Sequence, residues 1–101
     1  MRSIARSGRL LRALAQLLPD AEFSLIHERP WHSLTFCGVQ VCISVTVPPC
    51  YHADAMTRFV QNLPEHEFNL CGQLVADIAV VETAGTEGPL RFMIDALLLD
   101  A

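Results

Sequence analysis

The sequence predicts an α+β fold, a two-layer sandwich in which a four-stranded antiparallel sheet carries two helices on one face. Stretches of helical and strand periodicity alternate along the 101 residues, and an octapeptide at residues 18–25 recurs at residues 63–70 with five identities in eight positions. The recurrence indicates a duplicated helix-hairpin unit of order αββαββ. We therefore expect a single domain over residues 1–101, with internal repeats at 1–47 and 52–101.

Each half of the chain is predicted to begin with a helix. In residues 3–17 leucines recur along one side at helical spacing, with arginine and glutamine on the opposite side. A second helix is predicted to follow Asp54, a residue type suited to capping, because apolar residues then fall at i, i+3, i+4 and i+7. Both helices are expected to end at a Leu-Pro step, since Pro19 and Pro64 disfavour the α conformation of the residue before them.

Each helix is predicted to lead into a β-hairpin. Residues 34–36 and 39–47 alternate between apolar and polar side chains, so they are expected to pair across a turn at Cys37 and Gly38. Residues 74–82 and 90–99 form the second expected hairpin, which is joined by a loop containing two glycines. The two hairpins would together supply the four strands of the sheet.

The sheet surface opposite the helices is predicted to be apolar along the second hairpin. Hydrophobic residues make up 51% of the chain and charged residues only 18%, which leaves too few polar groups to cover a small monomer. We therefore expect a homodimer joined through sheet faces or sheet edges, with Trp31 as an anchor. Alternatively, an ordered N-terminal arm or residues 23–25 could cover this surface in a monomer.

The charge composition excludes several classes of function. Four arginines give the first twelve residues a charge of +4, whereas the other 89 residues carry eleven acids and three arginines, so the acidic body should repel nucleic-acid phosphates. Lysine is absent, which excludes Schiff-base chemistry and phosphate-loop binding. We expect a cytoplasmic protein without membrane contact, because no secretory signal and no apolar run of roughly 20 residues is visible.

The four cysteines are expected to be reduced thiols, because no pair has the two-residue spacing of a metal or redox motif. A zinc site could be drawn from Cys50, His52, His66 and Cys71, but their spacing matches no finger or ribbon pattern. The sequence therefore predicts neither a metal nor a cofactor.

The densest polar and aromatic cluster spans residues 27–32 and is the best candidate for the rim of a binding pocket. Trp31 and two histidines would form an amphipathic wall, and the planar guanidinium of Arg29 could hold a carboxylate. Alternatively, the cluster is a solvated strand end with Trp31 buried at an interface. The predicted ligand-binding residues, with two aspartates of the second hairpin, are His27, Arg29, Trp31, His32, Asp77 and Asp95.

Asp77 and Asp95 stand among apolar neighbours in the second hairpin. Pairing Glu82 with Leu90 would set the two carboxylates opposite one another, an arrangement suited to acid–base catalysis or to divalent-ion binding. Alternatively, each aspartate meets an arginine or water in a structural role. A thiol nucleophile at Cys37 or Cys42 activated by His32 is a further possibility for catalysis, although no acid that would orient the histidine is apparent.

Two hypotheses of function follow. The first is a non-enzymatic homodimer, an interaction or accessory module whose apolar sheet face makes the dimer. The second is a domain that binds or transforms a small carboxylate with residues 27–32 and Asp77 or Asp95. Enzymatic activity stays open, and the composition favours the non-enzymatic hypothesis. An open pocket at Trp31 would favour the second, whereas a second chain that occludes Trp31 and Asp77 would favour the first.

Overall fold

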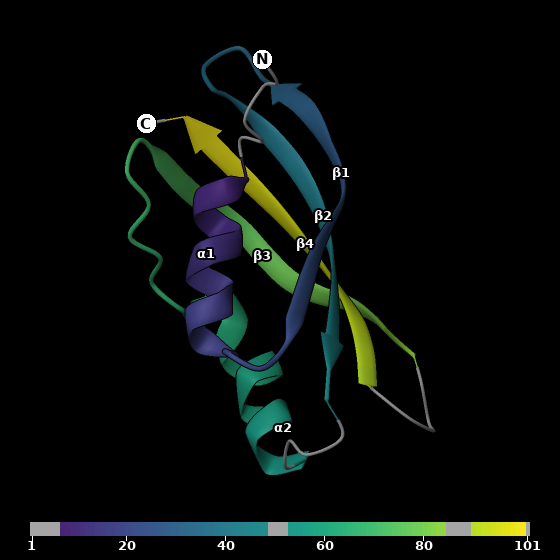
Figure 1. Ribbon diagram of the computed structural model, residues 1–101. Coiled ribbons are helices and arrows are strands. Elements are labelled where there is room, and N and C mark those ends of the chain that lie inside the picture. Colours follow the sequence, from purple (N-terminus) through teal and green to yellow (C-terminus); the bar gives the residue numbers. More distant parts are fainter. Residues whose placement is uncertain (1–6, 49–52, 85–89, 101) are drawn as a thin grey trace.

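The computed structural model describes residues 7–48, 53–84 and 90–100. Within these residues each half of the chain follows the order helix, strand, strand, with a short 3-10 helix after the second helix (Figure 1). The elements are α1 (Gly8–Leu17), β1 (Glu22–His32), β2 (Cys37–Val47), α2 (Ala53–Asn62), η1 (Leu63–Glu65), β3 (Gln73–Ala84) and β4 (Leu90–Asp100).

The four strands form one antiparallel sheet in the order β1-β2-β4-β3. Each half therefore contributes one hairpin, and the second strand of each hairpin lies at the centre of the sheet. The ladder between β2 and β4 joins the two halves, from Gly38 opposite Leu99 to Val47 opposite Leu90. The predicted α+β fold with a four-stranded antiparallel sheet and two helices is confirmed.

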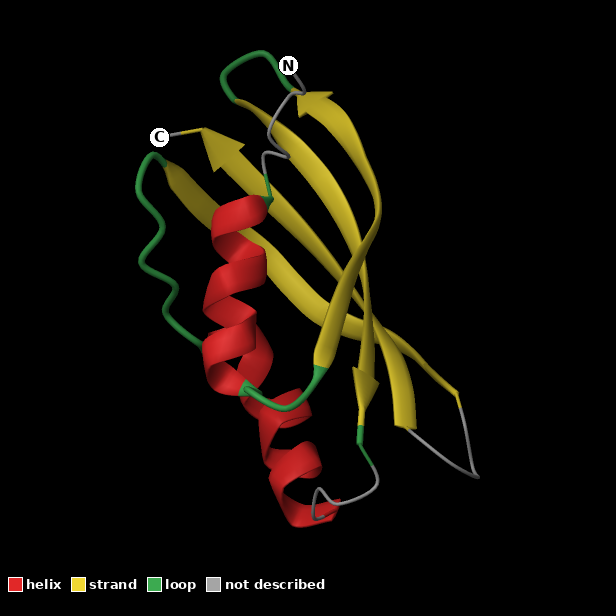
Figure 2. Cartoon of the chain, viewed as in Figure 1, coloured by secondary structure: helices red, strands yellow, loops and turns green. Residues whose placement is uncertain are grey.

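Both helices lie on the same side of the sheet (Figure 2). Alternate side chains of β2 and β4 point toward them because a strand presents successive residues to opposite faces. The helices contribute Leu10, Leu14, Leu18, Met56 and Leu63 to one buried cluster. The strands contribute Val39, Val41, Ile43, Val45, Val47, Ile78, Phe92, Ile94, Ala96 and Leu98 to the same cluster. The aromatic ring of Phe59 on α2 packs on that of Phe92, with centroids 5.9 Å apart.

A carboxylate from β1 caps the N-terminal end of α1. Ser7 precedes the helix and is fully buried, and its backbone N–H and hydroxyl both donate to Oε2 of Glu28, at 3.0 and 2.7 Å. The first turn of α1 contains no acidic residue of its own. Glu28 therefore supplies the negative charge that the positive end of the helix dipole favours.

The helices differ from their predicted bounds at their starts. α1 begins at Gly8, and residues 1–6, which include part of its predicted extent, lie outside the described residues. α2 begins at Ala53, so Asp54 lies inside the helix and is not its cap. The expected ends are close to those observed: α1 ends at Leu17, and α2 ends at Asn62 before η1 continues through Pro64.

The first hairpin was predicted with the wrong first strand. Residues 34–36 belong to the turn between β1 and β2, where the N–H groups of Thr35 and Phe36 donate to Oγ of Ser33. The pairing strand is β1, whose register shifts between Leu25 and His27. This β-bulge interrupts the alternation of side chains, and Pro30 further weakens the strand signal.

The repeated octapeptide occupies related but not identical positions in the two halves. Residues 18–25 lead from the end of α1 directly into β1, whereas residues 63–70 form η1 and an extended segment before β3 begins at Gln73. In both copies the phenylalanine and the last leucine are partly buried against the core: Phe23 and Leu25 in the first, Phe68 and Leu70 in the second. The octapeptide thus anchors each helix-strand connection to the core.

Neither of the two helices in the described segments combines the length and the hydrophobicity needed to cross a lipid bilayer.

Candidate functional site

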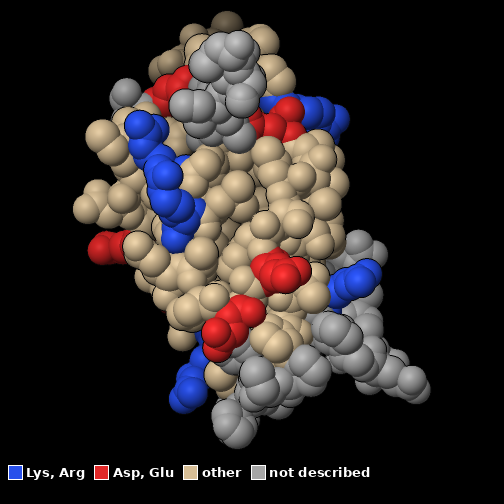
Figure 3. Space-filling model, viewed as in Figure 1, with Lys and Arg blue, Asp and Glu red and all other residues tan. Residues whose placement is uncertain are grey.

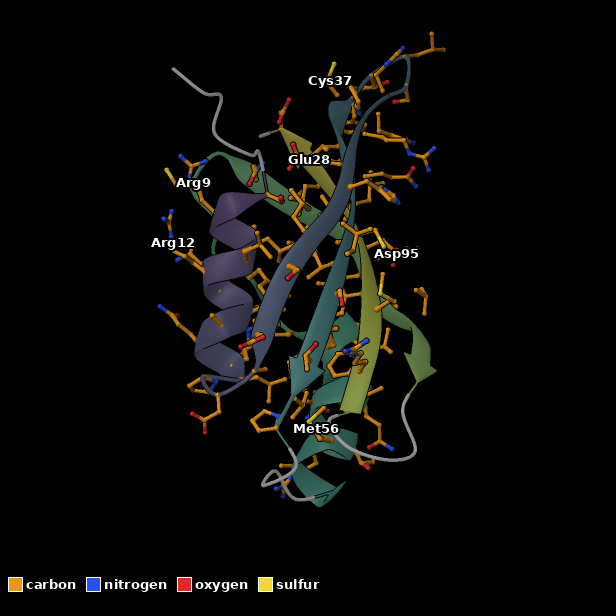
Figure 4. The ribbon with its side chains drawn as sticks, turned by 45° about the vertical axis from the view of Figure 1, so that its right-hand side comes forward. Arg9, Arg12, Glu28, Cys37, Met56 and Asp95 are labelled. Atoms are coloured by element: carbon orange, nitrogen blue, oxygen red, sulfur yellow. The ribbon has the colours of Figure 1, made fainter. Side chains whose placement is uncertain are left out.

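The side of the sheet away from the helices is hereafter called the outer face. Figure 4 shows Asp95 pointing to this side, whereas Met56 lies between α2 and the sheet. Strand register and burial assign to the outer face His27, Arg29 and Trp31 on β1, Gln40, Cys42 and Ser44 on β2, Met93, Asp95, Leu97 and Leu99 on β4, and Leu74, Asp77, Ala79 and Val81 on β3.

Two neighbouring rows of residues cross all four strands of the outer face, and we call them the charged rows. One row consists of His27, Cys42, Asp95 and Ala79, and the other of Arg29, Gln40, Leu97 and Asp77. Each row carries a basic residue on the β1 side and an acidic residue on the β4 or β3 side. The bulge between Leu25 and His27 shifts the alternation of β1 by one residue. This shift places His27 and Arg29 on the outer face and so gives each row its basic residue.

A depression of about 240 Å³ lies over the charged rows. His27, Arg29, Asp77 and Asp95 all line it, so strand pairing brings together four of the six predicted ligand-binding residues. The small side chain of Ala79 leaves room between the charged groups. The depression is large enough for a small organic ion, because one water molecule fills about 30 Å³ of liquid.

Positive and negative groups stand on opposite sides of the depression. Since neighbouring strands are about 4.8 Å apart, the Cα atoms of Arg29 and Asp77 are separated by about 14 Å across the sheet. All four charged or titratable side chains are exposed to solvent. Within the described part of the chain, neither Arg29 nor Asp77 has a salt-bridge partner.

The two aspartates are not directly opposite one another. Asp77 pairs with Leu97 and Asp95 pairs with Ala79, so the predicted register of the second hairpin is wrong by two residues at this point. The pairing already differs where the hairpin leaves its loop, because Glu82 pairs with Met93 and not with Leu90, and the bulge between Val80 and Glu82 reduces this offset from three residues to two. The two carboxylates are therefore diagonal neighbours on adjacent strands and not the directly opposed pair that was predicted.

Alternation along β1 divides the predicted cluster of residues 27–32. Glu28 lies on the helix side, where it caps α1. Trp31 belongs to the outer face but pairs with Gly38 nearer the turn, and His32 pairs with Cys37 at the strand end. Neither Trp31 nor His32 is among the residues that line the depression.

Six of the residues that line the depression, Gln40 and Leu97 among them, were not among the predicted site residues. Gln40 and Leu97 lie between Arg29 and Asp77 in the same charged row. Their positions in the alternation already placed both on the outer face. What the sequence could not give was the register across three ladders, because bulges shift it.

The cysteines among the described residues, Cys37, Cys42 and Cys71, form no disulfide bond. Cys42 is buried at the centre of the outer face, whereas Cys37 and Cys71 are exposed. No group of three or more potential metal ligands comes together in the described segments. Two members of the zinc set considered above, Cys50 and His52, lie outside them.

A second hollow of about 360 Å³ lies on the helix side, between the end of α1 and α2. Its walls are mainly apolar, from Leu17, Leu18, Phe59 and Leu63, with Arg58 and His66 among its polar residues. Apart from such groups, the surface on the helix side is mostly uncharged (Figure 3). Figure 4 shows Arg9 and Arg12 extending from α1 away from the sheet.

No model of a known protein family matches the chain, and a search of curated proteins gives no match. The outer face itself is therefore the feature that indicates a function.

Proposed function

We propose that the protein is a non-enzymatic homodimeric interaction module and that its outer face is the dimer interface. The observation that carries this proposal is the exposure of large apolar side chains beside the charged rows: Leu74 is 59% exposed and Val81 is 55% exposed. Leu97 and Leu99, on the central strand β4, are only partly buried. Since both helices pack on the other face, a second molecule is the economical cover for these side chains.

Face-to-face association is favoured over pairing of sheet edges. The edge strand β1 contains Pro30 and the bulge after Leu25, and the other edge strand, β3, contains two bulges. Proline and bulges interrupt the regular row of backbone groups that an added strand requires. Both edges therefore carry features that oppose edge pairing.

The size of the outer face suits a stable dimer. Four strands of 11 or 12 residues make a sheet face of roughly 700 Å². A standard protein interface covers about 800 Å² on each partner. A partner sheet aligned at about 30° could cover most of this area, as in a β-sandwich.

Light scattering during size-exclusion chromatography tests the proposal. We expect the protein to elute with twice its monomer mass of 11.2 kDa. Leu97→Asp places a charge at the centre of the outer face and should give a folded monomer. Leu34→Asp is the matched control, because Leu34 is fully exposed in the turn between β1 and β2. A wild-type monomer at high concentration, or a Leu97→Asp variant that stays dimeric, would refute the proposal.

A second candidate is a binding site for a small carboxylate in the depression. The specific observation in its favour is that Arg29 and His27 line one side of the same concave site. An arginine guanidinium binds a carboxylate through two parallel hydrogen bonds. Because this ligand and a second protein molecule would occupy the same face, the two candidates predict different behaviour.

A thermal-shift titration with small mono- and dicarboxylates tests the second candidate. Binding should raise the midpoint of unfolding in a saturable manner, and Arg29→Gln should abolish the shift. Arg58→Gln, which changes an exposed arginine on the helix side, should leave the shift intact. If no carboxylate raises the midpoint at millimolar concentration, this candidate is wrong.

We also propose that the chain arose by duplication of one helix-hairpin unit. Three observations support this: the repeated octapeptide, the common order of helix, strand and strand, and a sheet in which the two hairpins occupy equivalent places. The two copies differ in the connection between helix and first strand, which comprises residues 18–21 in the first half and residues 63–72 in the second. An insertion in one copy accounts for that difference.

A further inference from the structure

We infer that the dimer has a two-fold axis parallel to the strands, so that Arg29 of each molecule faces Asp77 of the other. This inference rests on the proposed face-to-face dimer and adds its orientation and its charged contacts. It follows from the arrangement of charges along the rows of the outer face.

Two sheets packed face to face in an aligned sandwich can be related by a two-fold axis in one of two directions. An axis parallel to the strands reverses the strand order, so that β1 faces the partner's β3 and β2 faces the partner's β4. An axis across the strands lays each strand on its own counterpart. The two arrangements bury the same surface but bring different charges together.

The parallel axis brings opposite charges together. Rotation about this axis does not change a residue's position along the strand direction. Arg29 on β1 therefore meets Asp77 on the partner's β3, and by symmetry the contact occurs twice. In the other charged row, Asp95 faces the partner's Cys42 and lies one strand away from the partner's His27. The sheets of a sandwich are rotated by about 30°, and the long side chain of Arg29 can follow this displacement.

The axis across the strands brings like charges together. In that arrangement β1 lies on the partner's β1. Arg29 then lies near the partner's Arg29, and His27 lies near the partner's His27. The acidic residues of β3 and β4 are likewise placed near their own counterparts. Juxtaposed like charges weaken an interface, so the charge distribution selects the parallel axis.

Charge reversal with rescue tests this orientation. The dimer dissociation constant is measured by sedimentation at low salt for wild type, Arg29→Asp, Asp77→Arg and the double variant. We expect each single reversal to raise the dissociation constant by about tenfold or more, since each disrupts two symmetry-related contacts. The double variant exchanges the two charges and should return to within a few fold of wild type.

Two control variants reverse charges away from the outer face. Arg58→Asp on α2 and Glu65→Arg in η1 both change exposed residues and should leave the dissociation constant unchanged. Circular dichroism confirms that each variant is folded.

The possible outcomes separate this inference from the proposed function. A wild-type protein that is monomeric refutes both. A dimer that is insensitive to the single reversals, or that the double variant fails to restore, refutes the orientation and leaves the face-to-face dimer standing. A dimer tightened by Arg29→Gln, which removes the two facing positive charges, would refute the parallel axis and point to the axis across the strands.

Discussion

At the scale of single residues, neighbouring side chains of β1 point to opposite faces of the sheet and make different contacts. Glu28 turns toward the helices and accepts two hydrogen bonds from Ser7, while His27 and Arg29 turn to the outer face. A cluster that is continuous in the sequence is therefore shared between the cap of a helix and a surface site. Composition alone identified the cluster, but only the alternation of the strand separates the two roles.

We predict that Glu28→Ala lowers the free energy of unfolding by about 1–2 kcal/mol, because the N–H and hydroxyl of Ser7 lose their acceptor and α1 loses its capping charge. Urea denaturation measures this change. Glu22→Ala is the matched control, since Glu22 is exposed on the same strand, and it should alter stability by less than about 0.5 kcal/mol. Equal effects of the two variants would show that the cap contributes nothing.

At the scale of elements, the regular strands were the ones that the sequence could predict. The predicted strand 39–47 falls within β2, and the predicted 90–99 lies within β4, because both alternate without interruption. β1 was missed because its bulge breaks the alternation, and the register of β3 was misplaced because local periodicity does not say which residues pair at the loop end of a hairpin. The bulges also decide which charged residues share a row. The sequence therefore predicted some residues of the site but not their arrangement.

A close approach of strands makes Gly38 intolerant of any side chain. It pairs with Trp31 on one side and Leu99 on the other, and a Cβ atom there would overlap the backbone carbonyl of Leu98. The ladder between β2 and β4 would have to open locally to admit a methyl group. A glycine at this position is thus required by the sheet itself.

We predict that Gly38→Ala lowers the free energy of unfolding by about 2 kcal/mol or more, because the added methyl group displaces the β2–β4 ladder. Gly8→Ala is the matched control: its Cβ would meet nothing within 4 Å, and alanine in a helix is favoured by up to about 1 kcal/mol. Chemical denaturation of both variants measures the difference. A harmless Gly38→Ala would contradict the packing described.

At the scale of the whole molecule, the two faces of the sheet are unequal. One face holds the core beneath two helices, while the other combines exposed leucine and valine with separated charges. The low proportion of charged residues predicted such a surface from composition alone. Which molecule covers the surface could not be read from composition, because it depends on how charges are distributed across four strands.

Because the outer face is proposed to be a dimer interface, we predict that the thermal unfolding midpoint rises with protein concentration. A dimer that dissociates on unfolding is stabilised by mass action, whereas a monomer is not. Differential scanning calorimetry over a hundredfold range of concentration measures the effect. The Leu97→Asp variant should show no such dependence, and a wild-type midpoint that does not move would contradict dimerisation.

The single ladder between β2 and β4 also bears on how the chain folds. Each hairpin closes between neighbouring strands, whereas this seam joins residues about 40 to 60 positions apart, and closing so long a loop carries a larger entropic cost. We therefore expect nascent hairpins to precede the seam, whose formation limits the rate of folding. The two hairpins would then form independently of one another, and the core that they share would be completed only in the last step of folding.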